Sequence, residues 1–245
     1  MGGAIAALAF LTALPVGRHA AVAGGDLRDG VLLLPAIGAF VGGLAAVAGW
    51  GAAIVLPPVP AAVLSVAAGV LVTGALHVDG LADTADGVGA SLAGGHPGPA
   101  MEDPRLGTFG GSALVLDLLL RVSVVSAFLA DGRFPKELLA AGALARTSVV
   151  VLALVVPYAG PRHGASSWIG TLDRRRSLAS LGTGAAIGFI TIGVRFVAMV
   201  VVAAFVCAIV GRWSSRRLGG MRGDTFGAVA ELVETLALAA ALATR

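Results

Sequence analysis

Long apolar runs separated by short polar stretches are the feature that most constrains the fold of this chain. The longest run, residues 178–211, covers 34 positions and carries one charge, Arg195. Because a membrane helix needs about 20 apolar residues, this run is long enough for two crossings. Lipid leaves unpaired backbone groups unsatisfied, and the runs lack the alternation of barrel strands. They therefore predict an all-α, polytopic transmembrane bundle.

The amino-acid composition supports this interpretation and limits the kinds of partner that the protein can bind. Hydrophobic residues make up 57% and charged residues 13% of the chain, whereas soluble domains carry about 25% charged residues. The bilayer is therefore the expected surrounding. A net charge of +3 is too small to indicate nucleic acid as a partner. The single cysteine, Cys207, lies inside an apolar run, so no disulfide framework is expected.

About seven spans, with six or eight as alternatives, are expected in one membrane domain covering residues 1–245. The expected spans are residues 31–56, 61–77, 108–130, 136–157, the two halves of 178–211, and 226–243. The turn between those halves is expected near Gly193 to Arg195. Residues 2–16 are too short for a crossing, so we expect a retained re-entrant or interfacial helix there.

Four polar segments separate these spans and define an orientation. They are residues 17–29, 78–107, 158–177 and 212–225. Because two spans separate each segment from the next, all four should lie on one face. They contain most of the basic residues, whereas Arg133 and Lys136 lie in a turn on the other side. The positive-inside rule makes the polar face cytoplasmic.

Three aspartates at helical spacing follow the second expected span. Asp79, Asp83 and Asp86 are four and three positions apart in the stretch from His77 to Gly87. On a helix they would share one face, within roughly 60° of arc. Adjacent carboxylates repel one another unless a cation neutralises them. The pattern predicts a Mg²⁺ site for a phosphorylated substrate, with solvated loop charges as the alternative.

A glycine-rich segment precedes the last expected span. Residues 219–228 read Gly-Gly-Met-Arg-Gly-Asp-Thr-Phe-Gly-Ala, and Glu231 and Glu234 follow. Free N–H groups at such a helix start suit phosphate oxygens, which makes Gly223 a candidate for substrate binding. Asp224 would share a helical side with both glutamates, whose burial in an apolar helix is costly and usually functional. The alternative for Asp224 is that it complements the helix dipole.

Further charged residues lie beside or inside the spans. Asp103 and Arg105 stand just before a span, where Arg105 could clamp a phosphate or anchor the helix end. Arg146 lies mid-span without a local partner and should face an acid or a wet cavity. Asp117 and Arg121 are four positions apart and are expected to pair.

The remaining chemistry comes from carboxylates, arginines and glycines. The sequence contains no Ser-His-Asp constellation, no Walker A loop and no zinc spacing. His77 adjoins the three aspartates and could act as a base, a hydrogen-bond donor or a polar helix cap. This set suits Mg²⁺-assisted displacement at phosphorus, in which arginine stabilises developing charge and an aspartate accepts the proton of the attacking hydroxyl.

Three stretches resemble the signature blocks of the cobalamin synthase family, the adenosylcobinamide-GDP ribazoletransferases. They are His77–Gly87, Asp103–Gly110, and Gly219–Ala228 with Glu231 and Glu234. Residues Phe10–Pro15 are also similar to the opening of the family, and the blocks occur in order over nearly the whole chain. One departure is the pair Met221-Arg222, where smaller or polar residues are expected.

The resemblance implies an inner-membrane enzyme that joins adenosylcobinamide-GDP to α-ribazole or its 5′-phosphate, releases GMP and uses Mg²⁺. Its active site would face the cytoplasm. The expected metal ligands are Asp79, Asp83, Asp86 and Asp224. The expected catalytic residues are these four and Arg105. The expected substrate-binding residues are His77, Asp103, Arg146, Gly223, Glu231 and Glu234. The identity of the general base and the existence of a homo-oligomer stay open.

Other functions remain as alternatives at this point. CDP-alcohol phosphatidyltransferases and polyprenyl-diphosphate transferases also use spaced aspartates at a membrane face. The first expects a longer aspartate register and the second expects two aspartate-rich loops. A cation transporter is the non-enzyme alternative, and it would carry acids near the midplane of several spans.

Overall fold

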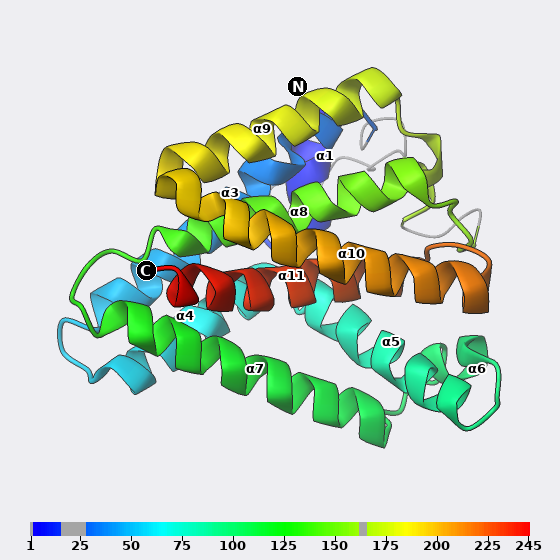
Figure 1. Cartoon of the computed structure of the whole chain (residues 1–245), viewed down its shortest axis with the longest axis horizontal. Helices are drawn as coiled ribbons and strands as arrows, with labels where there is room; N and C mark the ends of the chain where they lie inside the picture. The colour runs from blue at the N-terminus through cyan, green and yellow to red at the C-terminus, as the bar shows by residue number, and fades with distance from the viewer. Residues whose placement is uncertain (1, 16–27, 162–165) are drawn as a thin grey trace.

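The computed structural model describes residues 2–15, 28–161 and 166–245, and these residues are almost entirely helical (Figure 1). The α-helices are α1 (Gly2–Leu11), α3 (Leu34–Ala52), α4 (Pro58–Val72), α5 (Leu76–Leu92), α6 (Pro97–Met101), α7 (Thr108–Leu129), α8 (Glu137–Val155), α9 (Arg174–Ile192), α10 (Phe196–Leu218) and α11 (Gly223–Ala243). Three 3₁₀ helices, η1 (Val31–Leu33), η2 (Ser167–Thr171) and η3 (Gly193–Arg195), connect them. The all-α prediction is confirmed. Most of the polar segment 17–29 lies outside the described residues.

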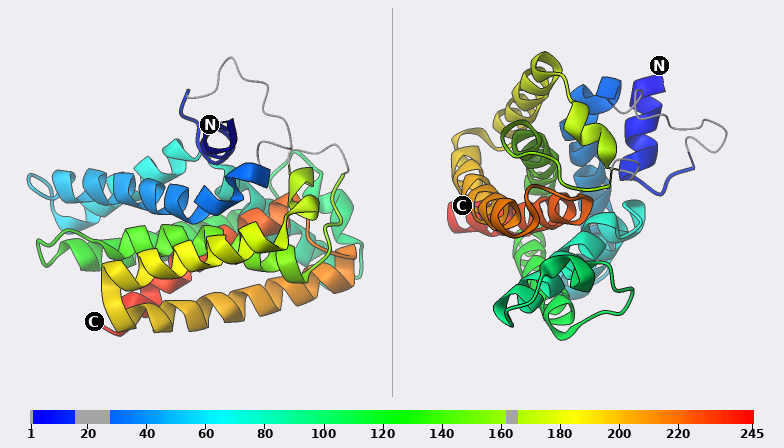
Figure 2. Two further views of the ribbon diagram at one scale, coloured as in Figure 1. Left: turned by 90° about the horizontal axis from the view of Figure 1, so that it is seen from above. Right: turned by 90° about the vertical axis from the view of Figure 1, so that its right-hand side faces the viewer.

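Within the described residues, five helical stretches are long and apolar enough to cross a membrane, or six if one bent pair counts as a span. This count does not confirm the expected seven. One of the five is the 45-residue stretch Arg174–Leu218, which contains η3 where the turn was expected. Figures 1 and 2 show α9 and α10 running in opposite directions on either side of η3.

The expected span 61–77 is wrong as a single straight helix. Helix α4 ends at Val72 and α5 begins at Leu76, and the two axes meet at 89°. Ala75 adopts a left-handed backbone conformation with a φ of 59°, which an α-helix cannot continue through. The bend carries the chain into α5 and therefore sets the direction of the helix that holds the three aspartates.

Small residues let the central helices approach closely. A Cβ added to Gly38 on α3 would collide with the carbonyl oxygen of Gly142 on α8, and the reverse holds for Gly142. Such small-residue contacts are typical of membrane helix pairs. Because the hydrophobic effect does not drive helices together in lipid, close van der Waals packing of the backbones stabilises the pair instead. Helix α11 packs against α5, α7, α8 and α10 and so occupies the interior of the bundle (Figure 1).

The short N-terminal helix α1 differs from the rest. It lies across one side of the bundle rather than along it (Figure 2). Its ten residues are too few to cross a bilayer, as expected for this segment. Phe10 and Leu11 at its end reach the region where α5 and α11 begin, which brings α1 to the edge of the candidate site.

Candidate active site

Helices α5 and α11 touch where their acidic residues lie. A Cβ added to Gly80 on α5 would stand 2.7 Å from the carbonyl oxygen of Asp224 and 3.2 Å from its Cα. Any side chain larger than glycine would push the two helices apart. Asp79 precedes Gly80 in sequence and Asp83 lies one turn further along α5. The crossing therefore joins the first and last acidic blocks, which are far apart in the sequence.

The beginning of α11 is held by its own backbone and by a neighbouring loop. The backbone N–H of Arg222 donates to the Thr225 hydroxyl at 2.8 Å in a capping box. Met221 is fully buried and exchanges two backbone hydrogen bonds of 2.8 Å with Pro157 and Ala159. Because these bonds fix the helix start, Gly223 and Asp224 are presented to the solvent-accessible space beside α5.

That space, here called the main cavity, has a volume of about 410 Å³. Its lining includes charged residues, among them Asp79, Glu102, Arg222 and Asp224, and apolar residues, among them Phe10, Leu11, Leu34, Val149, Trp168 and Ile169. His77, Arg146 and Gly223 also line it. Cavities of this size with a few convergent polar groups are the usual sites for small ligands.

A second hollow, here called the outer cavity, shares part of its acidic lining with the main cavity. Its volume is about 390 Å³, and Asp79, Asp83, Glu102, Asp103 and Arg105 are among its lining residues. Asp79 and Glu102 line both cavities. A group bound in one cavity would therefore meet a group bound in the other at Asp79.

Two ion pairs lie at these cavities. Arg222 contacts Glu102 at 3.1 Å, and Arg105 contacts Asp103 at 2.7 Å with 87% of the arginine side chain exposed. The hydrogen bonds from Arg105 lower the pKa of Asp103 to about 2. Burial raises the pKa of the Tyr158 hydroxyl, and the Asp224 carboxylate raises it further. Tyr158 lines the main cavity together with Asp79 and Asp224.

Asp86 has different neighbours from the other two aspartates of α5. Its two carboxylate oxygens accept the backbone N–H groups of Gly107 and Gly110, each at 2.8 Å. Gly107 is the residue that caps α7. Asp86 therefore neutralises the positive end of α7 and attaches that helix to α5. A metal-binding or catalytic role for Asp86 stays a prediction.

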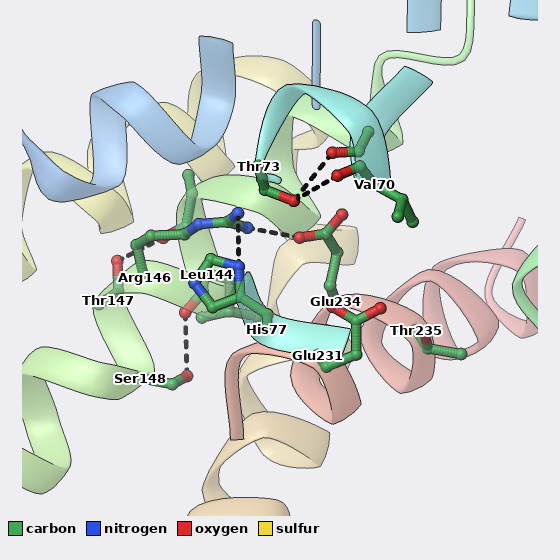
Figure 3. Close-up of polar contacts among 12 residues, drawn as sticks. Val70, Thr73, His77, Leu144, Arg146, Thr147, Ser148, Glu231, Glu234 and Thr235 are labelled. Carbon is green, nitrogen blue, oxygen red and sulfur yellow. Dashed lines mark hydrogen bonds and ion pairs between the residues drawn. The ribbon is translucent and has the colours of Figure 1, made fainter. Parts of the chain in front are cut away.

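A buried ion network lies deeper in the bundle, and Figure 3 shows the part of it around Arg146 and Glu234. The network comprises Asp117 and Arg121 on α7, Arg146 on α8, and Glu231 and Glu234 on α11. Arg121 lies 3.6 Å from Asp117, as the spacing predicted, and 2.8 Å from Glu231. Arg146 contacts Glu234 at 2.5 Å and lies 3.4 Å from the Nδ1 atom of His77. The network thus reaches the residue that begins the aspartate stretch.

The acidic residues at the helix crossing lack such partners. Among the described residues, no salt bridge joins a cation to the acidic cluster of Asp79, Asp83 and Asp224. In the part of the chain that the structure describes, no group of three or more acidic, histidine or cysteine side chains is arranged so that it could hold a metal ion by itself. Mg²⁺ usually keeps several waters and uses one or two carboxylates plus substrate phosphates. The donor chemistry therefore fits a site that a phosphorylated substrate would complete.

The structure adds residues that sequence reasoning did not select. Glu102, Arg222, Tyr158 and Trp168 all line the main cavity. The sequence signal for Arg222 was its departure from the expected block, and Tyr158 is the only tyrosine of the chain. Trp168 lies inside the polar segment 158–177 with no motif around it, so only the folded arrangement brings it to the site.

Comparison with known proteins identifies the family. The family model for cobalamin-5-phosphate synthase matches residues 3–242. An adenosylcobinamide-GDP ribazoletransferase from Stutzerimonas stutzeri (strain A1501) is 36% identical over 240 residues, covering 95% of this chain and 94% of the relative. The enzyme of that name from Escherichia coli (strain K12) is 35% identical, with 97% of this chain and 98% of the relative covered.

A more distant relative agrees. The adenosylcobinamide-GDP ribazoletransferase of Clostridium novyi (strain NT) is 30% identical over 244 residues, covering 99% of this chain and 97% of the relative. No solved structure matches. The family match and the relatives extend over nearly the full length of the chain. The first and last of the chain's signature blocks meet where α5 crosses α11. The chain therefore belongs to the cobalamin-5-phosphate synthase family and is a membrane-embedded transferase of cobalamin biosynthesis.

Proposed function

We propose that this enzyme joins adenosylcobinamide-GDP to α-ribazole, or to α-ribazole 5′-phosphate, and releases GMP with the help of Mg²⁺. The single observation that carries the proposal is the position of Asp79, which lines both the main and the outer cavity. A transfer between two substrates needs two binding spaces that meet at the reacting atoms. The names of the relatives support the choice of substrates.

In this proposal the nucleoside binds in the main cavity and the diphosphate binds in the outer cavity. The ribose 3′-hydroxyl attacks the phosphorus attached to cobinamide, and the bond from that phosphorus to the GMP oxygen breaks. Asp79 accepts the hydroxyl proton, because it is the only aspartate of α5 among the residues lining both spaces. The leaving GMP keeps the electron pair of the broken bond.

Asp79, Asp83 and Asp224 would hold Mg²⁺ together with the diphosphate, and the ion would neutralise the negative charge that opposes attack. Arg105 at the outer cavity would contribute a bidentate contact to phosphate oxygens after leaving Asp103. The N–H groups at the start of α11, including that of Gly223, would orient the substrate in the main cavity. Arg146, fixed by Glu234, would position His77.

We further propose that the site faces the cytoplasm from the inner membrane. Figure 1 supports this orientation, because α6 and the start of α11 lie at one end of the molecule and η3 at the other. The end with the site also carries Arg174, Arg175 and Arg176 at the start of α9. Basic residues gathered at one end fit the positive-inside rule.

The decisive experiment supplies purified protein in proteoliposomes with adenosylcobinamide-GDP, α-ribazole and Mg²⁺. We expect stoichiometric formation of adenosylcobalamin and GMP, and no product when either substrate is omitted. Cation flux across the same vesicles, without GMP release, would favour the transporter alternative. Turnover of CDP-alcohol or polyprenyl-diphosphate substrates in place of the cobinamide would favour the other two transferase classes.

A further inference from the structure

The main cavity is lined by apolar residues from three separate elements, and the part beside Phe10 and Trp168 is here called its aromatic end. Phe10 and Leu11 come from α1, Val149 comes from α8, and Trp168 and Ile169 come from η2. The rings of Phe10 and Trp168 pack edge to face, with centroids 5.7 Å apart and planes at 87°. This end therefore offers an aromatic surface to a flat, apolar group.

Trp168 also carries an unused hydrogen-bond donor. Its side chain is buried, with 4% of the residue exposed, and its indole Nε1–H has no acceptor among the described residues. A buried indole N–H normally finds a partner, because leaving it unpaired is costly. The backbone of Trp168 is itself held, since its carbonyl oxygen accepts the Thr171 hydroxyl at 2.7 Å. The donor therefore belongs to a cavity-lining side chain, and because its nitrogen is buried, the ring must turn toward the cavity to reach a ligand.

We infer that this end of the main cavity is the base pocket for the nucleoside substrate, and that Trp168 donates its Nε1–H to a ring nitrogen of a flat heteroaromatic base. This inference rests on the proposed function and assigns one of its two substrates to a subsite. The benzimidazole base of α-ribazole is apolar on both faces and has one ring nitrogen free to accept a hydrogen bond. It matches both features of the pocket.

The size of the main cavity excludes the corrinoid of adenosylcobinamide-GDP but not its guanosine, so α-ribazole binding is tested without that substrate. A cavity of about 410 Å³ lies near the lower end of the range for small-molecule sites. A nucleoside fits such a space, whereas a corrinoid is far too large for it. With the base at Trp168, the sugar would lie in the same cavity as Asp79 and Asp224. The pocket would thereby orient the attacking hydroxyl.

The first test measures binding rather than turnover. α-Ribazole is titrated calorimetrically into the full-length protein without adenosylcobinamide-GDP, comparing Trp168→Phe with Trp50→Phe. Phenylalanine keeps the aromatic wall but removes the N–H, so Trp168→Phe should weaken binding about fivefold to tenfold, the worth of one neutral hydrogen bond. Trp50 is exposed and donates to Gly132 at 3.4 Å, remote from the cavity, so its variant should bind like the unaltered protein.

The second test changes the ligand and needs no variant. An analogue of α-ribazole in which a C–H group replaces the free ring nitrogen should bind the unaltered protein about fivefold to tenfold more weakly than α-ribazole. The same analogue should bind Trp168→Phe and the unaltered protein alike, because the hydrogen bond is already absent. In turnover, Trp168→Phe should raise the KM for α-ribazole and leave the KM for adenosylcobinamide-GDP unchanged.

Equal binding of α-ribazole and the analogue to the unaltered protein would overturn the inference, even if Trp168→Phe failed to fold. So would equal α-ribazole affinity of Trp168→Phe and Trp50→Phe. In either case GMP release by the unaltered protein would leave the proposed function standing. Absence of both α-ribazole binding and GMP release would instead remove the proposed function itself.

Discussion

The buried ion network and the acidic cluster are both rich in carboxylates, yet they are neutralised in different ways. In the network, Arg121 lies within 3.6 Å of Asp117, Glu231 and Glu234, and Arg146 contacts Glu234. Among the described residues, the acidic cluster of Asp79, Asp83 and Asp224 has no such arginine. Each group lies against α11, and the two are linked through His77 and Arg146.

The difference shows how the same residue type serves two purposes in one membrane protein. Charges deep in a bundle are tolerated when a partner offsets their desolvation, so paired carboxylates can hold helices together. Unpaired carboxylates beside a cavity instead repel one another and favour a cation from outside. We therefore expect the network to govern stability and the acidic cluster to govern turnover, and four variants examine this division.

The largest effect is expected from Asp83→Ala in the acidic cluster. It should lower the rate of GMP release by at least about 10³-fold, because it removes charge that would stabilise the transferring phosphate through Mg²⁺. The thermal unfolding midpoint should stay the same, since no ion pair is lost. Asp131→Ala, at an exposed site paired with Arg245, is the matched control and should retain full activity. Normal turnover by Asp83→Ala would refute the metal role.

Arg121→Met should have the largest effect on stability. It leaves three buried carboxylates without their shared partner, which typically costs about 3–5 kcal/mol. Thermal unfolding in detergent would measure the loss, with Arg105→Met as the control at an exposed position. An unfolding midpoint for Arg121→Met equal to that of the control would show that the network does not hold the helices together.

Asp86→Ala should destabilise the protein by roughly 2 kcal/mol, because two backbone N–H groups at the start of α7 lose a charged acceptor. Asp86→Asn keeps one acceptor oxygen and should recover part of that stability. If Asp86 only caps α7, GMP release should recover in parallel with stability. A stable Asp86→Asn protein without activity would instead place Asp86 with the metal ligands or the base.

The smallest effect is expected from Arg105→Ala. Its side chain is 87% exposed and pairs with Asp103, and exposed charge pairs contribute little because solvent screens them. The KM for adenosylcobinamide-GDP should rise by less than about tenfold, with kcat nearly unchanged. Steady-state kinetics at two ionic strengths would check this, since salt screens an exposed contact. A large fall in kcat would mean that Arg105 acts on the transition state.

Local sequence patterns predicted much of the helical architecture. The 3.6-residue period placed Asp79, Asp83 and Asp86 on one helix, and α5 contains all three. The i, i+4 spacing predicted the contact between Asp117 and Arg121. Such features depend on neighbours within one or two turns, so the sequence alone can reveal them.

Contacts between helices were harder to predict from the sequence. The sequence predicted that Arg146 would face an acid or a wet cavity but not that Glu234 would be the acid. It grouped Asp86 with its helical neighbours, whereas the structure turns both of its oxygens toward α7. The bend at Ala75 divides a span that looked continuous. In each case, several arrangements fit the local sequence equally well, and packing between segments distant in the chain selects one of them.

Apolar length and helical period are properties of contiguous residues, so they already identified a helical membrane protein with three acidic blocks. Three-dimensional packing was needed to show that Gly80 lets α5 touch Asp224, that Asp79 lines two cavities, and that Trp168 lines one of them. Those arrangements depend on how closely backbones pack across the bundle. The distance between packed backbones is set by many residues at once, so no single stretch of the chain determines it.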